Sequence, residues 1–291
     1  MKMLISLGFL FVSILHAGVF VTPPAWGNDL KTVFEKKYAN AGFIASDLVP
    51  VGTIIQLSEQ RLTTSGPDEI FVDIGKRQGI KKGDRFTVYS LDRYIYHPVL
   101  QVGGMFARAE KYTRRTGYPS REIMSNPGKP VGHRVVIQGV IEIIESGDKV
   151  SSARAVKSYD SIETGHLLTP YKKFEDQTAA FPETDKSIEG YIVASKGDRI
   201  GLKDDDIVYI DKGWEDNVRS GDYFEVYTIP TLEKNIWYKL EPEKTPLLPF
   251  VQGEIKIIDT QKKTATAIVV KSRTDIVIGN PIRFKHSHHP G

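Results

Sequence analysis

The chain has 291 residues, and its 39 lysine and arginine residues nearly balance its 36 aspartate and glutamate residues. This balance gives no support to nucleic-acid binding, which relies on a basic surface. The absence of cysteine excludes disulfides, cysteine-based zinc sites and a lipid-modified N-terminal cysteine, so an exported form must hold its fold by core burial alone.

Residues 1–27 have the order of a secretory signal peptide. A positive start is followed by an apolar run at 4–21, two prolines, and small residues on either side of Trp26. We predict cleavage after Gly27, so that the mature protein begins at Asn28 and is exported. A retained membrane anchor stays open as the alternative, because residues 4–21 would just cross a bilayer core of about 30 Å.

A short lead-in at 28–50 follows the signal peptide. Helical periodicity is clear only over 29–38, where Asp29 suits the N-cap and four apolar side chains share one face: Leu30, Val33, Phe34 and Tyr38. We therefore expect one short N-terminal helix. The remainder is rich in glycine and in short runs of Val, Ile, Thr and Tyr, which is typical of strands joined by turns.

From residue 51 onward, later segments of the chain repeat earlier ones at two constant sequence offsets, which we call registers. Residues 52–55 return at 190–193 and residues 83–89 return at 221–227, both offset by 138 positions. Residues 138–144 return at 252–258, and 156–158 at 270–272, both offset by 114 positions. Two constant registers predict an internal duplication. The change of register means that the first copy carries 24 extra residues between Tyr89 and Gln138.

The positions shared by the two copies are turns and strands. Glycine supplies backbone angles that other residues resist, and aspartate bonds its own backbone in tight turns. Alternation predicts inward side chains on the strand after the second turn, namely Phe86, Val88, Phe224 and Val226. The structural turn residues are Gly75, Gly83, Asp84, Gly213, Gly221 and Asp222.

The predicted fold class is mostly β, with two tandem copies of a small β-barrel or sandwich module and a short N-terminal helix. The registers also set the domain boundaries. They place the first module at 51–172 with an insertion near 100–128, a linker at 173–187, the second module at 188–285, and a tail at 286–291.

The insertion near 100–128 is the segment most specific to this protein. Arginine and tyrosine on an exposed hairpin can grip an anionic or protein partner. Surface charge is also common without any partner, so a solvated loop stays open as the alternative. The possible partner contacts are Arg108, Lys111, Tyr112, Arg114, Arg115, Tyr118 and Arg121.

Neither a metal site nor a catalytic set is predicted. An acidic group at Asp198, Asp204, Asp205, Asp206 and Asp211 could supply oxygen ligands to Ca²⁺, but its spacing does not match an EF-hand loop. The histidines at 286, 288 and 289 are assigned to a ragged tail. No nucleophile-elbow, zinc-protease or phosphate-loop motif is present. We expect no cofactor, no metal and no catalytic residue.

Several blocks of the sequence resemble the C-terminal region of bacterial envelope proteins that carry an N-terminal LysM peptidoglycan-binding module. Part of the repeat, Gly83-Asp84-x-Phe86-x-Val88-Tyr89, also resembles the C-terminal domain of a flagellar assembly protein of the basal-body ring. No LysM module is found here, because residues 28–41 are too few to hold one, so glycan binding does not carry over. The matching blocks are Gly42-Phe43-Ile44, Val51-Gly52-Thr53-Ile54, Asp73-x-Gly75, Gly79-x-x-x-Gly83-Asp84-x-Phe86-x-Val88-Tyr89, His97-Pro98-Val99, 139–144 and 153–158.

The resemblance implies an exported protein of the periplasm or outer envelope of a Gram-negative bacterium. The first hypothesis is a non-catalytic structural or interaction protein, whose partner is another envelope protein, the cell wall or an envelope-spanning machine. A polymer- or glycan-binding module is the alternative, and a cell-wall hydrolase is the third.

Overall fold

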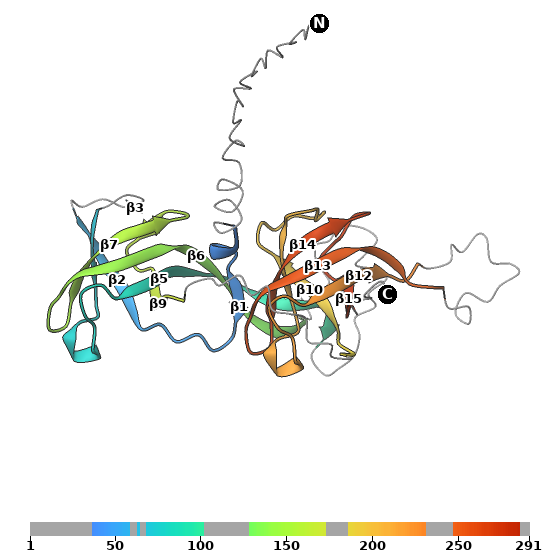
Figure 1. Cartoon of the computed structure of the whole chain (residues 1–291), viewed down its shortest axis with the longest axis horizontal. Helices are drawn as coiled ribbons and strands as arrows, with labels where there is room; N and C mark the ends of the chain where they lie inside the picture. Colours follow the sequence, from blue (N-terminus) through green and yellow to red (C-terminus); the bar gives the residue numbers. More distant parts are fainter. Residues whose placement is uncertain are drawn as a thin grey trace, which may run out of the picture.

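The computed structural model describes residues 37–58, 63–64, 68–101, 128–172, 186–230 and 247–285. Almost all of these residues belong to strands and to the turns between them, which confirms a mostly β fold (Figure 1). The predicted signal peptide, most of the predicted helix at 29–38, and the histidine-containing tail lie outside the described ranges. Within those ranges, no helix has the length and hydropathy to cross a membrane.

The first unit is a seven-stranded sheet with the order β1-β6-β5-β9-β2-β4-β7. Because β6 also pairs with β7, six of these strands form a closed ring, and β1 lies along the edge of β6. The short strands β3 (Thr63–Thr64) and β8 (Ile162–Glu163) pair separately. The sheet strands are β1 (Phe43–Ala45), β2 (Gly52–Leu57), β4 (Glu69–Val72), β5 (Arg85–Gln101), β6 (Gly128–Ser146), β7 (Ser151–Ser158) and β9 (Leu167–Pro170).

The second unit is a closed barrel with the order β10-β11-β14-β13-β12-β15. Single-turn 3₁₀ helices follow the second strand of each ring, at Lys76–Gln78 and Trp214–Asp216. The strands of the second barrel are β10 (Glu189–Ser195), β11 (Ile207–Ile210), β12 (Tyr223–Thr228), β13 (Phe250–Thr260), β14 (Ala265–Ser272) and β15 (Pro281–Phe284).

The two rings have the same strand order. Followed from its first strand, β2-β4-β7-β6-β5-β9 matches β10-β11-β14-β13-β12-β15. Bulges recur at matching places as well. The register shifts at 54–56 and 143–145 lie 138 and 114 positions before those at 192–194 and 257–259. A bulge turns the intervening side chain outward, so the same positions face away from the core in both rings.

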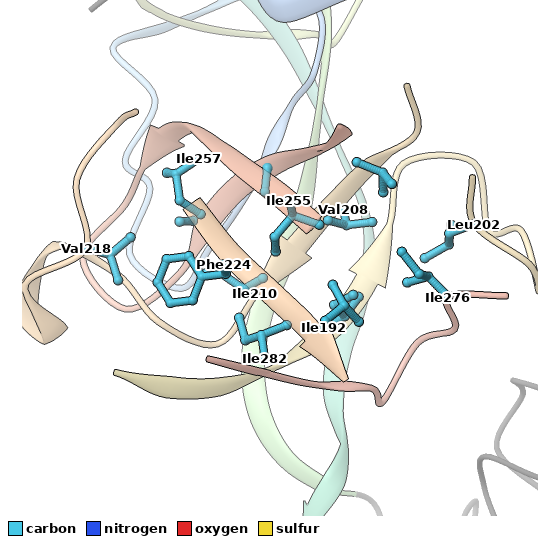
Figure 2. Packing of buried hydrophobic residues seen from close by; sticks show 14 residues of the cluster. Ile192, Leu202, Val208, Ile210, Val218, Phe224, Ile255, Ile257, Ile276 and Ile282 are labelled. Carbon is cyan, nitrogen blue, oxygen red and sulfur yellow. The ribbon is translucent and has the colours of Figure 1, made fainter. Parts of the chain in front are cut away.

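Each ring encloses its own apolar core, because alternate residues of its strands point inward. In the second barrel, Phe224 lies among isoleucine and valine side chains from the surrounding strands (Figure 2). The predicted inward positions are confirmed. Phe86 is 6% exposed, and Val88, Phe224 and Val226 are fully buried.

Two strands of the first ring extend well beyond it. β5 and β6 have 17 and 19 residues, whereas the corresponding β12 and β13 have 6 and 11. Most of the predicted 24-residue excess therefore lies in longer strands, on both sides of the range 100–128, because antiparallel pairing continues out to Gln101 and Gly128. We call residues 90–101 and 128–136 the arm.

The Gly-Asp turns form as predicted. Gly83 and Gly221 have φ of +90° and +94°, a region that favours glycine. The side chain of Asp84 accepts a hydrogen bond from the N–H of Lys81 at 2.8 Å. Asp222 does the same for the N–H of Arg219, also at 2.8 Å. These carboxylates tie each turn to the residue three positions earlier.

Gly75 and Gly213 require glycine for a different reason than the one predicted. Their φ angles are −155° and −128°, which other residues also adopt. There is no space for a side chain at either position. A Cβ on Gly75 would lie 2.6 Å from the carbonyl oxygen of Gly147, and one on Gly213 would lie 2.4 Å from that of Gln261. Close approach of two backbone segments therefore selects glycine at both positions.

We expect Gly75→Ala to lower the free energy of unfolding by about 3 kcal/mol, because the new methyl group displaces a backbone carbonyl. Gly83→Ala is the matched control in the same barrel. A Cβ there meets nothing within 4 Å, so only backbone strain of about 1 kcal/mol remains. Urea unfolding of both variants measures the difference, and equal losses would contradict the close-approach explanation.

Candidate functional site

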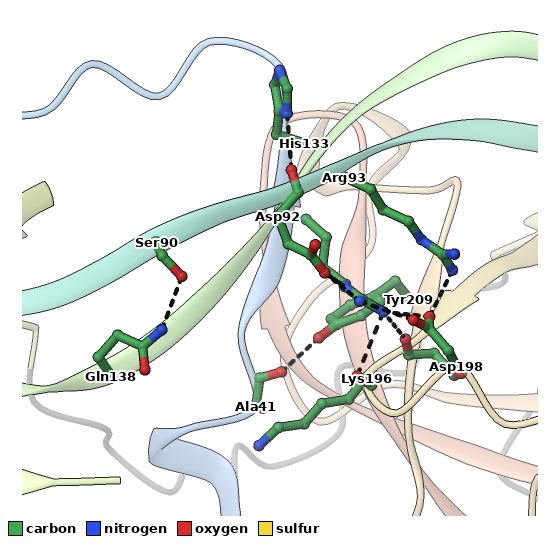
Figure 3. A network of polar contacts seen from close by, with 11 residues as sticks. Ala41, Ser90, Asp92, Arg93, His133, Gln138, Lys196, Asp198 and Tyr209 are labelled. Carbon is green, nitrogen blue, oxygen red and sulfur yellow. Dashed lines mark hydrogen bonds and ion pairs between the residues drawn. The ribbon is translucent and has the colours of Figure 1, made fainter. Parts of the chain in front are cut away.

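A group of charged side chains lies at the junction between the two barrels, where the arm crosses the second barrel (Figure 3). Arg134 of β6 is at its centre and is 7% exposed. Its guanidinium donates to Asp92 of β5 at 2.9 Å, to Asp198 at 2.5 Å and 3.1 Å, and to the backbone carbonyl of Ser195 at 2.9 Å. Arg93 also donates to Asp198, at 2.6 Å. Two side chains of the arm, Arg134 and Arg93, thus bind the segment that leaves β10, and Asp92 binds Arg134.

The charges in this group stabilise one another. Burial by itself would lower the pKa of Arg134, but the hydrogen bonds and charges of Asp198 and Asp92 outweigh it and raise the pKa above its usual value. The hydrogen bond from Arg134 lowers the pKa of Asp92. A buried guanidinium is tolerated only with such partners, so this group favours a closed junction.

The strap, residues 40–45, lies between the two barrels. One edge of β1 pairs with β6, with Ile44 opposite Arg134. The other edge faces the second barrel, whose side chains donate to its backbone carbonyls. The donors are Tyr209 to Ala41 at 2.7 Å, Thr266 to Gly42 at 2.9 Å, Thr264 to Ile44 at 2.6 Å, and Lys196 to Asn40 at 2.6 Å.

The same contacts remove Tyr209 and Lys196 from water. Burial raises the pKa of Tyr209 and lowers the pKa of Lys196, because a buried side chain resists becoming charged. Tyr209 therefore acts as a neutral donor to the strap.

His97 attaches the far part of the arm to the second barrel. Its Nδ1 accepts the N–H groups of Val99 and Leu100, at 3.1 Å and 2.9 Å, so Nε2 carries the proton. Nε2 donates to Oδ2 of Asp211 at 3.1 Å. The other oxygen of Asp211 accepts the N–H of Tyr191 at 2.6 Å. One carboxylate thus holds both the start of the second barrel and the arm.

An apolar cluster completes the junction. Residues of the strap and arm pack directly against outward-facing side chains of the second barrel. The cluster comprises Ala41, Ile44 and Ile95 from the first unit, with Val193, Ala194, Ile207, Tyr209, Ile258 and Ile268 from the second. Since apolar burial accompanies the ionic contacts, the junction has the character of a domain interior rather than of a transient contact.

The chemistry available at the junction is structural. Catalysis needs a nucleophile beside a base, or carboxylates that converge in an open cleft. Here the charged side chains of Asp92, Arg134, Asp198 and Asp211 bind one another, His97 or the backbone. Such an arrangement fixes the orientation of the two barrels.

A groove of about 430 Å³ lies on the second barrel between β10, β12 and β15. Its cations are already paired. Lys186 contacts Asp222 at 2.9 Å, Arg283 contacts Glu225 at 2.7 Å, and Lys285 contacts Glu254 at 2.6 Å. Neutralised in this way, the groove offers little to a charged ligand.

The acidic residues considered as calcium ligands do not converge. Asp198 binds Arg134, and Asp211 binds His97. Across the described ranges, no group of three or more histidine or acidic side chains is placed to hold a metal ion. The others serve local contacts: Asp204 accepts the N–H of Ser272, Asp205 pairs with Lys37, and Asp206 accepts the N–H of Lys203.

All seven predicted partner contacts, from Arg108 to Arg121, lie outside the described residues. The junction residues Asp92, Arg134 and Asp198 were missed as a contact group by sequence reasoning. A signal existed for two of them, because Asp92 and Arg134 lie in the stretch between Tyr89 and Gln138 that carries the extra residues. Charged residues confined to one copy point to a role outside the shared scaffold.

Comparison with known proteins does not add an assignment. No protein-family model matches the chain, and no curated protein is significantly similar to it in sequence.

Proposed function

We propose that this protein is a non-catalytic, exported component of the Gram-negative envelope that acts as a two-barrel scaffold for interactions with another envelope protein or with the cell wall. The single observation that carries the proposal is the junction. Ionic and apolar contacts at Arg134, His97 and Tyr209 join the arm and both barrels into one unit. A fixed spacing between two units suits a structural role.

The two units are, in this proposal, tandem copies of one module. The shared strand order and the bulges at matching offsets support a duplication. A hydrogen bond from a backbone N–H to an aspartate side chain, found at the same place in both units, also supports a duplication. Asp73 accepts the N–H of Thr53 at 2.5 Å, as Asp211 accepts that of Tyr191. What the copies share is scaffold, which favours a structural over an enzymatic role.

The interaction is assigned to the segment between β5 and β6 that carries Arg114 and Arg115. It follows the part of the arm that His97 attaches to the second barrel, so both of its ends leave a fixed platform. Arginine and tyrosine in such a segment can bind carboxylates or apolar surfaces of a partner.

We expect the double variant Arg114→Glu and Arg115→Glu to lose its partner in pull-downs from envelope extracts while its melting temperature stays unchanged. The matched control is Lys81→Glu with Lys82→Glu, an adjacent pair of exposed cations in a turn of the first barrel. Retention of every partner by the Arg114 and Arg115 variant would remove this segment from the proposal. Equal loss in the control would reduce the effect to net charge.

Polymer or glycan binding is the second candidate, and exposed aromatic rings on the arm favour it. Tyr94 and Tyr96 are 36% and 49% exposed with ring centroids 5.1 Å apart, and His133 packs edge-on against Tyr94 at 4.8 Å. Flat rings of this kind can stack on a sugar face. Co-sedimentation with purified sacculi separates the candidates, because direct retention that Tyr94→Ala and Tyr96→Ala abolish favours glycan binding. Zymography tests for hydrolase activity.

A further inference from the structure

One outward face of the first barrel has the same construction as the face of the second barrel that is buried in the junction. In the second barrel, Val193 and Ile258 are the outward residues of the bulges in β10 and β13. The corresponding bulge residues of β2 and β6 are Ile55 and Ile144. Phe71 of β4 lies opposite Ser152, just as Tyr209 of β11 lies opposite Thr266.

Exposure differs sharply between these equivalent positions. Val193, Ile258 and Thr264 are 3%, 6% and 3% exposed, because the strap and the arm cover them. Their counterparts Ile55, Ile144 and Val150 are 44%, 37% and 41% exposed. We call Ile55, Phe71, Ile144 and Val150 the acceptor face. Phe71 is partly buried beside these three exposed side chains, and a group of neighbouring apolar side chains with this exposure marks an interaction surface.

The acceptor face is more apolar than the buried face that it matches. Phe71 replaces Tyr209 and Val150 replaces Thr264, so two hydroxyl groups that bind the strap are absent. Like Asp211, Asp73 accepts a hydrogen bond from a backbone N–H. The carboxylate of Asp211 also binds His97, whereas the carboxylate of Asp73 is exposed. The occupant of this face therefore needs apolar side chains, because Phe71 and Val150 have no hydroxyl group to donate to backbone carbonyls.

The opposite end of the molecule meets that requirement. The residues that follow β12 and those around the start of β13 correspond to the beginning of the arm. Among them, Ile229, Leu248 and Phe250 are 56%, 86% and 49% exposed. Leu248 occupies the position of Arg134, which is the centre of the junction. In Figure 1, β13 runs out on the side away from the first barrel, whereas β2 and β7 lie on the side of the first barrel away from the second. We call Ile229, Leu248 and Phe250 the donor end.

We propose that copies of this chain associate head to tail, with the donor end of one molecule on the acceptor face of the next. The contact repeats the geometry of the junction within the chain, with apolar groups in place of the ionic group around Arg134. Because the two surfaces differ, the contact is heterologous, and each added molecule leaves one acceptor face and one donor end available. This association goes beyond the proposed envelope role and does not depend on it.

Sedimentation velocity of the mature chain over a range of concentrations tests the proposal. The expected result for the natural sequence is a mass that rises with concentration beyond a dimer. Ile55→Glu, on the acceptor face, and Leu248→Glu, on the donor end, are each expected to remain monomeric. Val270→Glu, at an exposed apolar position of β14 outside both surfaces, is the control and is expected to associate like the natural sequence.

Mixing the two variants gives the decisive result. Ile55→Glu retains its donor end and Leu248→Glu retains its acceptor face, so an equimolar mixture is expected to form a dimer that grows no further. Circular dichroism and a thermal melt check that each variant folds, and Val150→Glu takes the place of Ile55→Glu if that variant does not. A natural sequence that stays monomeric at all concentrations overturns the proposal. A mixture that stays monomeric, or one that grows beyond dimers, also overturns it.

Discussion

Replacing Tyr209 by alanine is expected to lower the free energy of unfolding by about 4 kcal/mol, the usual cost of removing a large buried aromatic side chain. Tyr209 is 1% exposed, packs between the strap and the second barrel, and donates to the carbonyl of Ala41. Its removal opens a cavity at the junction and leaves that carbonyl without its donor.

The equivalent residue of the first barrel provides the control. Phe71 has the same place in its ring but only partial burial, so Phe71→Ala is expected to cost about 1 kcal/mol. Chemical denaturation at low protein concentration measures both variants without a contribution from association. Equal losses would mean that the junction does not distinguish the two positions.

Replacing Arg134 by alanine is expected to lower stability by about 3 kcal/mol and to split the unfolding of the two barrels into separate steps. The figure is at the lower end of the range for breaking a buried ion pair, because the carboxylates of Asp92 and Asp198 keep partial access to water. Loss of the guanidinium leaves Asp92 without this partner and Asp198 with Arg93 alone, so the negative charge at the junction is less well compensated and an open arrangement is favoured.

Calorimetry and hydrogen exchange check this result. Calorimetry should show two transitions in place of one, and exchange should accelerate in the strap and arm before it does in either core. The control is Arg77→Ala, which removes an exposed contact with Asp148 and is expected to leave unfolding nearly unchanged. A single transition at the original midpoint for Arg134→Ala would show that the other junction contacts hold the barrels together without Arg134.

The location of charge in the molecule has a structural logic. At the junction within the chain, the two barrels are always present together, so a buried ionic group such as Arg134 with Asp198 finds its partner without loss of translational freedom. At the proposed contact between molecules, apolar side chains such as Leu248 and Phe71 avoid the desolvation of charges during association.

Local features of the fold were predictable from the sequence by itself. Alternation identified Phe86, Val88, Phe224 and Val226 as inward side chains, since a strand with one buried face repeats every two residues. The Gly-Asp turns at 83–84 and 221–222 were predictable because positive φ and a carboxylate that bonds its own backbone are local properties.

Only the tertiary structure decided how each ring of strands closes and which outward-facing side chains are covered. Pairing of β2 with β9, and of β10 with β15, joins residues that no local pattern connects. Ile55 and Val193 show the limit most clearly. Both are apolar bulge residues at the same position of their rings, yet one is 44% exposed and the other 3%. Periodicity tells which side chains face away from their own core, but whether a strap and an arm from elsewhere in the chain cover them depends on non-local packing.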